Sequence, residues 1–488
     1  MSMSLRSQAL SGFRWTVSVR LLSQLVTWVI TLAVIRLLAP ADYGLLAMAT
    51  VFVAFLTMFS ELGLGAAIVQ KAEVDEKLLK RAFGLILIVH FSLAALLALA
   101  APLIAAFYTE PRVIPILRVL SLQFLLAAFA VIPDAQLQRR MEFRNRSILD
   151  FSGAVVASGT TLLMAMAGSG VWALVAGSLV SQAFKTIGIN CLSPFLRWPD
   201  FSLQGLRSLL QFGGNFTAVQ VFWMFLSQVD VLICAKWLGN EVLGFYSVAM
   251  QLASLPSQRM SGLVNQVAFP TFARMQSELR RVGESVLSGA RILSFFSFPV
   301  LWGMSSVAPE IVVVILGEKW ALATVPLQVL TLIMPLRIVG NFVATAVQGI
   351  GRSDIVLRSV MWSSFVTPIL LIVGVHNWGL LGLSLAWLVA SPFSFVQSMV
   401  RSSPVLGLGL RQLAGAMVPA ACTGFFMYGA VALARHFLLT GQGDMVRLGV
   451  LIGIGALAYG VVSLAINRKG VLEVLATVRS IVVVKHQH

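Results

Sequence analysis

Charged residues are scarce in this sequence. Asp, Glu, Lys and Arg make up 11% of its 488 residues, whereas hydrophobic residues make up 58%. A soluble domain normally has roughly a quarter of its residues charged, because these residues coat its surface. No interval between the apolar runs is long enough to fold as a separate soluble domain. The composition therefore excludes a soluble enzyme or binding protein and predicts a chain that lies mostly within a membrane.

Cysteine and histidine, which act in many catalytic and metal sites, are also scarce in the sequence. The three cysteines, Cys191, Cys234 and Cys422, lie far apart, so they form neither a disulfide framework nor the spacing of a thiolate metal site. The five histidines are scattered, and the sequence contains no glycine-rich phosphate loop. We therefore expect no metal, no cofactor and no enzymatic activity.

Long apolar runs occupy most of the chain. A helix needs about 20 apolar residues to cross a hydrocarbon core of about 30 Å, and many runs reach that length without strand-like alternation. The pattern predicts an all-α polytopic membrane protein with about fourteen transmembrane helices. The predicted spans are 10–38, 42–68, 82–107, 112–134, 147–167, 171–191, 208–237, 241–268, 286–316, 323–350, 355–375, 379–399, 412–434 and 446–467.

The basic residues recur in short loops and account for a formal net charge of +16. With the N-terminus in the cytoplasm, every second loop is enriched in Lys and Arg, for example around Lys80 and Arg81 and around Arg139 and Arg140. This pattern is typical of cytoplasmic loops and predicts that both termini are cytoplasmic. The basic residues do not form the continuous stripe that nucleic-acid binding needs, so no nucleic acid is expected as a partner.

An internal repeat with an offset of about 200 residues divides the chain. In residues 33–45 and 232–245 a helix ends at a basic residue, an acidic turn follows, and a glycine opens the next helix. Residues 115–120 and 335–339 also match. Two such halves are typical of secondary transporters, with the substrate path between them. The predicted parts are two six-helix lobes and two additional helices with a cytoplasmic tail, at 1–200, 201–411 and 412–488.

Polar residues line one face of the predicted span 241–268. Their spacing of three and four residues places them within about 80° of arc on a helix. A polar stripe on a membrane helix faces protein or water, so it indicates either hydrogen bonds between helices or a wet cavity. The length of the stripe favours the cavity. Its residues are Gln251, Ser254, Gln258, Ser261 and Asn265.

The predicted span 323–350 has a similar face that includes a charge. Arg337, Asn341, Thr345 and Gln348 lie on it. An Arg near the bilayer centre costs at least ~2.5–3.5 kcal/mol on insertion scales, so it implies a partner or an aqueous pocket. A guanidinium favours an anion and matches phosphate oxygens bidentately at any pH. A diphosphate linked to a sugar and a polyprenyl chain fits these features. The cation would bind the diphosphate, the amides would bind the sugar hydroxyls, and an opening to lipid would admit the polyprenyl chain.

Three further arginines lie within predicted spans and are candidates for the same cavity. Arg118 is the repeat mate of Arg337, and Arg20 and Arg259 belong to the first and eighth spans. The alternative role for each is a salt bridge to a buried carboxylate. Arg20 and Arg118 also lie close enough to a surface to extend their charge into it.

The carboxylates available as partners are Glu61, Asp150 and Asp230. Each can neutralise one of the intramembrane arginines. Glu61 and Asp230 are also candidates for proton or sodium coupling, although structural pairing is the simpler role. The sequence does not decide between these roles.

Three segments carry a family likeness: residues 36–50, 61–70 and 137–143, the last reading Leu-Gln-Arg-Arg-Met-Glu-Phe. They resemble the polysaccharide transporter family of Wzx-type flippases, and among its members the colanic acid exporter-like proteins. The resemblance extends over nearly the whole chain. It implies the multidrug/oligosaccharidyl-lipid/polysaccharide exporter fold, with two lobes around a cationic cavity and alternating access.

The resemblance also implies a function. The expected activity is translocation of polyprenyl-diphosphate-linked oligosaccharide repeat units across the bacterial inner membrane, for exopolysaccharide or lipopolysaccharide biosynthesis. Besides this lipid-linked oligosaccharide and membrane lipid, the implied partners are a polysaccharide polymerase and a chain-length regulator. The resemblance does not identify the glycan.

Three other functions compete with this interpretation. A lipid II-type flippase would differ only in its substrate. A cation-coupled exporter of the same fold would favour carboxylates over arginines in its cavity. A membrane glycan polymerase would need a large outside loop, whereas the predicted outside loops have at most about a dozen residues.

Overall fold

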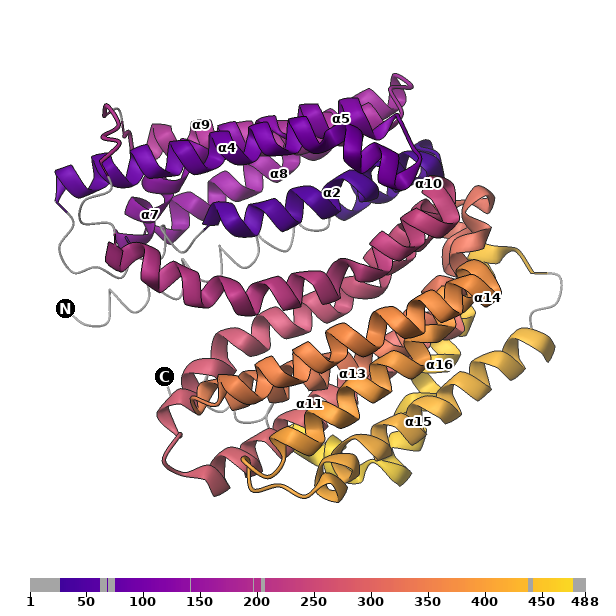
Figure 1. The fold of residues 1–488 in the computed structure, drawn as a ribbon. Coiled ribbons are helices and arrows are strands. Elements are labelled where there is room, and N and C mark those ends of the chain that lie inside the picture. Colours follow the sequence, from indigo (N-terminus) through magenta and orange to yellow (C-terminus); the bar gives the residue numbers. More distant parts are fainter. Residues whose placement is uncertain are drawn as a thin grey trace, which may run out of the picture. The chain divides into compact units, whose positions relative to one another are not determined.

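The structure is a computed structural model in which most of the described chain is α-helical (Figure 1). The chain divides into two compact units, unit 1 (Met1–Gly244) and unit 2 (Phe245–His488). The structure describes residues 27–61, 68, 75–140, 142–195, 197–202, 207–437 and 442–476.

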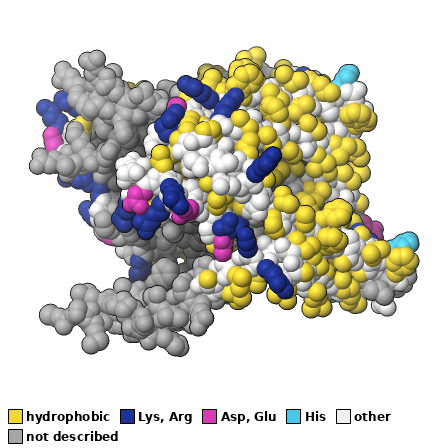
Figure 2. Space-filling model, turned by 90° about the horizontal axis from the view of Figure 1, so that it is seen from below, with side chains coloured by type: hydrophobic (Ala, Val, Ile, Leu, Met, Phe, Trp, Pro, Cys, Tyr) yellow, Lys and Arg dark blue, Asp and Glu magenta, His cyan; other side chains and the backbone are white. Residues whose placement is uncertain are grey.

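Ten of the described helices are long and apolar enough to cross a membrane, and one bent pair raises the number to eleven. Two of the ten contain a non-helical break, at Gly239 (φ 81°) and at Trp378–Gly379 (φ 56° at Gly379). Each break falls at or beside the turn predicted between two spans, so each of these helices has two arms. Hydrophobic side chains cover large areas of the surface in Figure 2. The described chain is therefore all-α and multi-pass, as predicted.

Unit 1 starts with a described helix at Thr27–Leu37 and ends within the long helix α10. In this unit α8 packs along α9, and α4 packs against α5 and α6. The labelled helices are α2 Pro40–Glu61, α4 Glu76–Tyr108, α5 Val113–Leu120, α6 Leu122–Ala128, α7 Val131–Arg139, α8 Phe143–Met166, α9 Val171–Leu192 and the first arm of α10 Arg207–Arg274.

The predicted span 112–134 is broken. The helical axis bends by 43° between α6 and α7. Pro133 lacks the N–H that would donate to the carbonyl of Phe129, four residues earlier. The side-chain amide of Asn190 in α9 donates to that carbonyl instead, at 2.9 Å. The carbonyl of Phe129 therefore keeps a hydrogen-bond partner at the break, which is the condition for a broken membrane helix.

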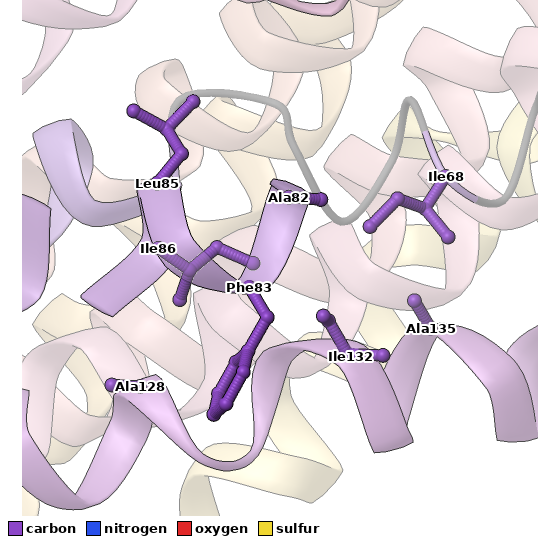
Figure 3. Packing of buried hydrophobic residues seen from close by; sticks show 8 residues of the cluster. All are labelled: Ile68, Ala82, Phe83, Leu85, Ile86, Ala128, Ile132 and Ala135. Carbon is purple, nitrogen blue, oxygen red and sulfur yellow. The ribbon is translucent and has the colours of Figure 1, made fainter. Parts of the chain in front are cut away.

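Phe83 of α4 packs into this bend, pointing toward Ala128 and Ile132 in Figure 3. Its ring centroid lies 6.1 Å from that of Phe129 and 5.5 Å from that of Phe195, with the rings edge to face. Packing therefore supports the same bend that Asn190 supports by hydrogen bonding. The buried cluster consists of Ile68, Ala82, Phe83, Leu85, Ile86, Ala128, Ile132 and Ala135.

The segment that follows α9 docks on the start of α4. The backbone N–H of Asp200 donates to the carbonyl of Lys80 at 3.0 Å, and Arg81 Nε donates to the Asp200 carboxylate at 3.1 Å. The backbone N–H of Ser202 and the Arg81 guanidinium together lower the pKa of the Asp200 carboxyl. These contacts therefore stabilise the charged form of the carboxylate and attach the segment to the start of α4.

The two copies of the repeated turn meet inside unit 1. A Cβ added to Gly44 would lie 1.6 Å from the carbonyl oxygen of Asn240, and one added to Gly244 would lie 1.8 Å from that of Pro40. The second contact is the first with the two copies of the turn exchanged, since Gly44 corresponds to Gly244 and Pro40 to Asn240 at an offset of 200 residues. Such a reciprocal contact is what a two-fold rotation produces.

Unit 2 contains the second arm of α10 from Phe245 onward and all later helices. In it α11 packs against α13 and α15, α13 packs against α14, and α15 packs against α16. The predicted span 286–316 is not one straight helix, because α11 ends at Ser306 and a π-helical turn follows α12. The helices are α11 Leu279–Ser306, α12 Ala308–Ile311, α13 Thr324–Gly349, α14 Ser353–Ser402, α15 Leu410–Phe437 and α16 Asp444–Ile466.

An ion-pair cluster attaches the last two helices to the rest of unit 2. The side chain of Glu310 in α12 is only 4% exposed and accepts two hydrogen bonds from Arg435 of α15, at 2.8 and 2.7 Å. Arg447 of α16 lies 3.2 Å from the same carboxylate. Arg435 also donates to the carbonyl of Ser306. One buried carboxylate therefore joins α12, α15 and α16.

The Glu310→Gln variant is expected to lose about 3–5 kcal/mol of stability, because two partly buried guanidinium groups would lose their counter-charge. The measurement is thermal unfolding of the purified protein in detergent. Glu284→Gln is the matched control, since Glu284 pairs with Arg280 at the surface and its side chain is 66% exposed. Surface pairs contribute little, so the control should unfold like the parent. Equal unfolding of both variants would show that the cluster does not hold these helices.

Candidate substrate-binding site

Helix α13 carries a polar face in unit 2. Arg337, Asn341, Thr345 and Gln348 are each partly exposed, whereas most of the helix is buried. Their spacing of three and four residues places them within about 80° of arc. The structure therefore brings the residues predicted for this helix together on its partly exposed face.

Arg337 lies in the middle of α13, roughly 20 Å from either end at 1.5 Å per residue. Its guanidinium carbon is 5.5 Å from the centroid of the Trp387 ring in α14. The Trp387 side chain is buried, and its indole N–H donates to the hydroxyl of buried Tyr246 in α10 at 2.9 Å. Three helices of unit 2 therefore meet behind the guanidinium.

The ion pairs among the described residues do not include Arg337. The contact with Trp387 stabilises it by roughly 0.5–2 kcal/mol. That is less than the ~2.5–3.5 kcal/mol that an Arg costs at the centre of a membrane helix. An aromatic face also leaves the charge in place, so the remaining cost requires water or an anion. The face of α13 is therefore suited to hold an anion, with Asn341 and Gln348 available to bind hydroxyl groups.

The stripe on the second arm of α10 is exposed where the structure describes it. Gln251 and Gln258 are exposed, and Ser254 between them is partly exposed. The Ser254 hydroxyl donates to the Gln251 carbonyl at 2.9 Å, and the Gln258 amide donates to the Ser254 hydroxyl at 3.1 Å. These hydrogen bonds lie within one helix. Among the described side chains they do not connect α10 to a neighbour, which favours a wet surface over hydrogen bonding between helices.

Several predicted residues lie outside the described part of the chain. Arg20 is one of them. Glu61 ends α2, and Arg259, Ser261 and Asn265 belong to α10, but their side chains lie outside the described residues. Their roles stay predictions.

The remaining predicted residues belong to unit 1. Arg118 is exposed in the last turn of α5 and is absent from the ion pairs of the described residues. Asp230 is buried at 2% exposure and accepts the backbone N–H of Val231 at 2.8 Å, whereas Asp150 is exposed. Within the described chain, no group of three or more His, Cys, Asp or Glu side chains can hold a metal ion.

Lys185 of α9 is an intramembrane cation that the sequence analysis missed. It is partly exposed and belongs to none of the ion pairs of the described residues. It shares a helix face with Gln182 and Ser178, and Gln123 of α6 donates to the Ser178 hydroxyl at 3.0 Å. The available signal was a lysine in an apolar run with polar residues three and seven positions earlier.

Helices broken inside the membrane and a polar face with a central cation are features of transporters. The fold and the site therefore define a multi-pass membrane transporter. Comparison with known proteins supplies the family. Residues 33–325, more than half of the chain, match the family described as "Polysaccharide biosynthesis protein". The chain belongs to this family of polysaccharide transporters and flippases, which are not enzymes, and the resemblance found in the sequence is confirmed.

Individual relatives match most of the chain. The teichuronic acid biosynthesis protein TuaB of Bacillus subtilis (strain 168) is 25% identical over 468 residues, which cover 93% of this chain and 95% of TuaB. The lipopolysaccharide biosynthesis protein WzxC of Escherichia coli (strain K12) is 25% identical over 418 residues, 84% of each chain. The solved structure of the lipid II flippase MurJ in an inward closed conformation has a TM-score of 0.77 at 13% identity and covers 93% of this chain and 99% of MurJ. The last comparison shows a shared fold.

Cysteines placed at Gln251 and Gln258 are expected to react with a membrane-impermeant thiol reagent, whereas a cysteine at buried Leu252 should not. A cysteine at Leu99, which is 78% exposed in α4, serves as the control for a lipid-facing position and should also stay unlabelled. The parent protein for these variants has its native cysteines replaced, because Cys191 and Cys422 are exposed. Equal labelling at all four positions would remove the wet-surface interpretation.

Proposed function

We propose that the protein is a flippase that moves polyprenyl-diphosphate-linked oligosaccharide repeat units across the bacterial inner membrane by alternating access. The observation that carries this proposal is Arg337, a cation in the middle of a membrane helix that is not paired with a described carboxylate. A diphosphate provides the missing negative charge, because its oxygens match the two N–H edges of a guanidinium. A guanidinium group carries a permanent positive charge under physiological conditions, so it is suited to bind an anion throughout a transport cycle.

The other polar residues suit the remaining parts of this ligand. Asn341 and Gln348 lie on the same face as Arg337, and their amides both donate and accept hydrogen bonds, as sugar hydroxyls require. Gln251 and Gln258 offer the same groups on α10. The polyprenyl chain needs only the surrounding lipid. A substrate with an anion, hydroxyls and an apolar tail therefore uses all of these features.

Further cations are proposed as secondary contacts for the diphosphate. Arg118 and Lys185 of unit 1 are exposed or partly exposed and are absent from the ion pairs of the described residues. Arg20 and Arg259 are proposed with them on the sequence pattern alone.

The names of the relatives support the pathway. TuaB is named for teichuronic acid biosynthesis and WzxC for lipopolysaccharide biosynthesis. We therefore propose a role in exopolysaccharide or lipopolysaccharide biosynthesis, next to a polysaccharide polymerase and a chain-length regulator that act on the flipped units.

The proposed topology has fourteen spans and two cytoplasmic termini. The ten long helices and the bent pair give eleven described spans. The breaks in α10 and α14 divide each of these helices into two spans, which adds two. Thr27–Leu37 is the described end of the first span, which makes fourteen. The alternation of basic loops supports the orientation. The proposed lobes are those of the sequence repeat, with α15 and α16 as additional helices.

Deleting the gene tests the proposed function. Without a flippase, lipid-linked repeat units are expected to accumulate in the membrane while exported polysaccharide disappears. Both quantities are measured after feeding cells with radiolabelled sugar, in lipid extracts and in the medium. The intact gene should restore export. Normal export in the deletion strain, with no accumulation of lipid-linked units, would contradict the proposal.

A further inference from the structure

Two aromatic residues, Trp387 and Tyr246, lie behind Arg337. The sequence pattern did not indicate them, and the proposed substrate does not need to contact them. We propose that Trp387 and Tyr246 are positioning residues for Arg337: they fix the plane of its guanidinium so that its N–H edges bind a phosphate group. This inference rests on the proposed function and extends it to residues that do not touch the substrate. The observation is the chain of contacts from Arg337 to the Trp387 ring at 5.5 Å and from its indole N–H to the Tyr246 hydroxyl at 2.9 Å.

An aromatic ring holds an arginine differently from a carboxylate. A carboxylate accepts hydrogen bonds from the edge of the guanidinium and neutralises its charge. A ring contacts the flat face and leaves the charge and the N–H donors of the edge in place. The ion pairs of the described residues do not include Arg337, and its guanidinium contacts the Trp387 ring. This contact leaves the positive charge of Arg337 able to bind an anion.

The hydrogen bond to Tyr246 fixes the ring itself. Trp387 is 5% exposed and Tyr246 is fully buried. A buried indole N–H without an acceptor would be costly, so the ring is held in the orientation that keeps this bond. The two residues belong to α14 and α10, and Arg337 belongs to α13. Packing of three helices therefore determines where the Trp387 ring lies against the guanidinium of Arg337.

A fixed plane matters for a ligand that is recognised by geometry. A phosphate accepts two parallel hydrogen bonds from a guanidinium only when the two groups are nearly coplanar. A lysine ammonium has no plane and binds as a point charge. The positioning residues are therefore expected to matter for an arginine at position 337 and to matter little for a lysine there.

The experiment is a double-mutant cycle on flipping in vesicles that contain the purified protein. The substrate is the lipid-linked repeat unit extracted from the deletion strain. Trp387→Leu is expected to lower kcat/KM about ten-fold in the parent and at most about two-fold in the Arg337→Lys background. Trp387→Phe, which keeps an aromatic face, should recover part of the loss. A loss of the same size in both backgrounds would overturn the positioning role.

Tyr246→Phe keeps the ring and removes only the hydroxyl, so it remains informative if Trp387→Leu does not fold. It is expected to raise KM about three-fold with kcat unchanged, and to lower the unfolding temperature because the buried indole N–H of Trp387 loses its acceptor. An unchanged KM in folded protein would overturn the role of Tyr246. The two proposals fail separately. Full activity of Arg337→Ala would contradict the proposed site, whereas an inactive Arg337→Ala with equal losses from Trp387→Leu would contradict only the positioning.

Discussion

Replacing Arg337 by alanine is expected to abolish polysaccharide export and to leave the protein inserted in the membrane in normal amount. The side chain lies in the middle of α13 on its partly exposed face, so its removal does not open the buried core. Two charge-assisted hydrogen bonds to a phosphate, each contributing about 1.5–3 kcal/mol, correspond to a loss of at least about 100-fold. Export is measured in the deletion strain carrying each variant, and membrane levels of the protein are measured in parallel.

Arg337→Lys separates charge from geometry. It keeps the positive charge but cannot make the bidentate contact, so it should retain roughly a tenth of the parent activity. Arg280→Ala is the matched control, because the Arg280 side chain is 94% exposed and pairs only weakly at the surface. It should export normally. If Arg337→Ala also exports normally, the residue is part of the scaffold and the assignment of the site is wrong.

Adding a methyl group to Gly44 or Gly244 is expected to prevent normal folding. The new Cβ would lie 1.6 or 1.8 Å from a backbone carbonyl oxygen, and backbone cannot move aside as a flexible side chain can. An ordinary overpacked site costs about 1–3 kcal/mol, and a backbone clash at this distance should cost more. Small residues at such crossings allow membrane helices to approach closely. The measurement is the amount of monodisperse protein recovered from membranes, for Gly44→Ala and Gly244→Ala.

Gly429→Ala is the matched control for these two variants. Gly429 lies in α15, and an added Cβ there meets no atom within 4 Å. Alanine also favours a helix over glycine by about 1 kcal/mol, so this variant should be recovered at least as well as the parent. Normal recovery of both Gly44→Ala and Gly244→Ala would mean that the two turns are not packed as described.

The course of the helices was predictable where a local signal marks each turn. The breaks at Gly239 and Trp378–Gly379 lie at or beside turns predicted between apolar runs, since glycine accepts the positive φ that ends a helix there. The bend between α6 and α7 was not predicted. The apolar run continues through it, and the amide that satisfies the carbonyl of Phe129 belongs to Asn190, 61 residues later. The periodicity of the sequence does not indicate such a contact between distant residues.

The candidate site was also predictable only in part. The polar face of α13 followed from the spacing of Arg337, Asn341 and Gln348, because helical periodicity is a local property. Trp387 and Tyr246 did not follow, because an aromatic residue in an apolar helix is normally part of the core. Their connection to Arg337 depends on three helices that are brought together only by folding.

The central claim is that this protein moves a lipid-linked oligosaccharide across a membrane, and reconstitution into sealed vesicles tests it most directly. The vesicles carry the radiolabelled lipid-linked repeat unit in both leaflets, and an impermeant glycan-cleaving enzyme is added outside. With the parent protein, the protected inner pool is expected to become accessible, whereas with Arg337→Ala and in protein-free vesicles it should stay protected. An inner pool that remains protected with folded parent protein, or that is released equally by Arg337→Ala, would contradict the account.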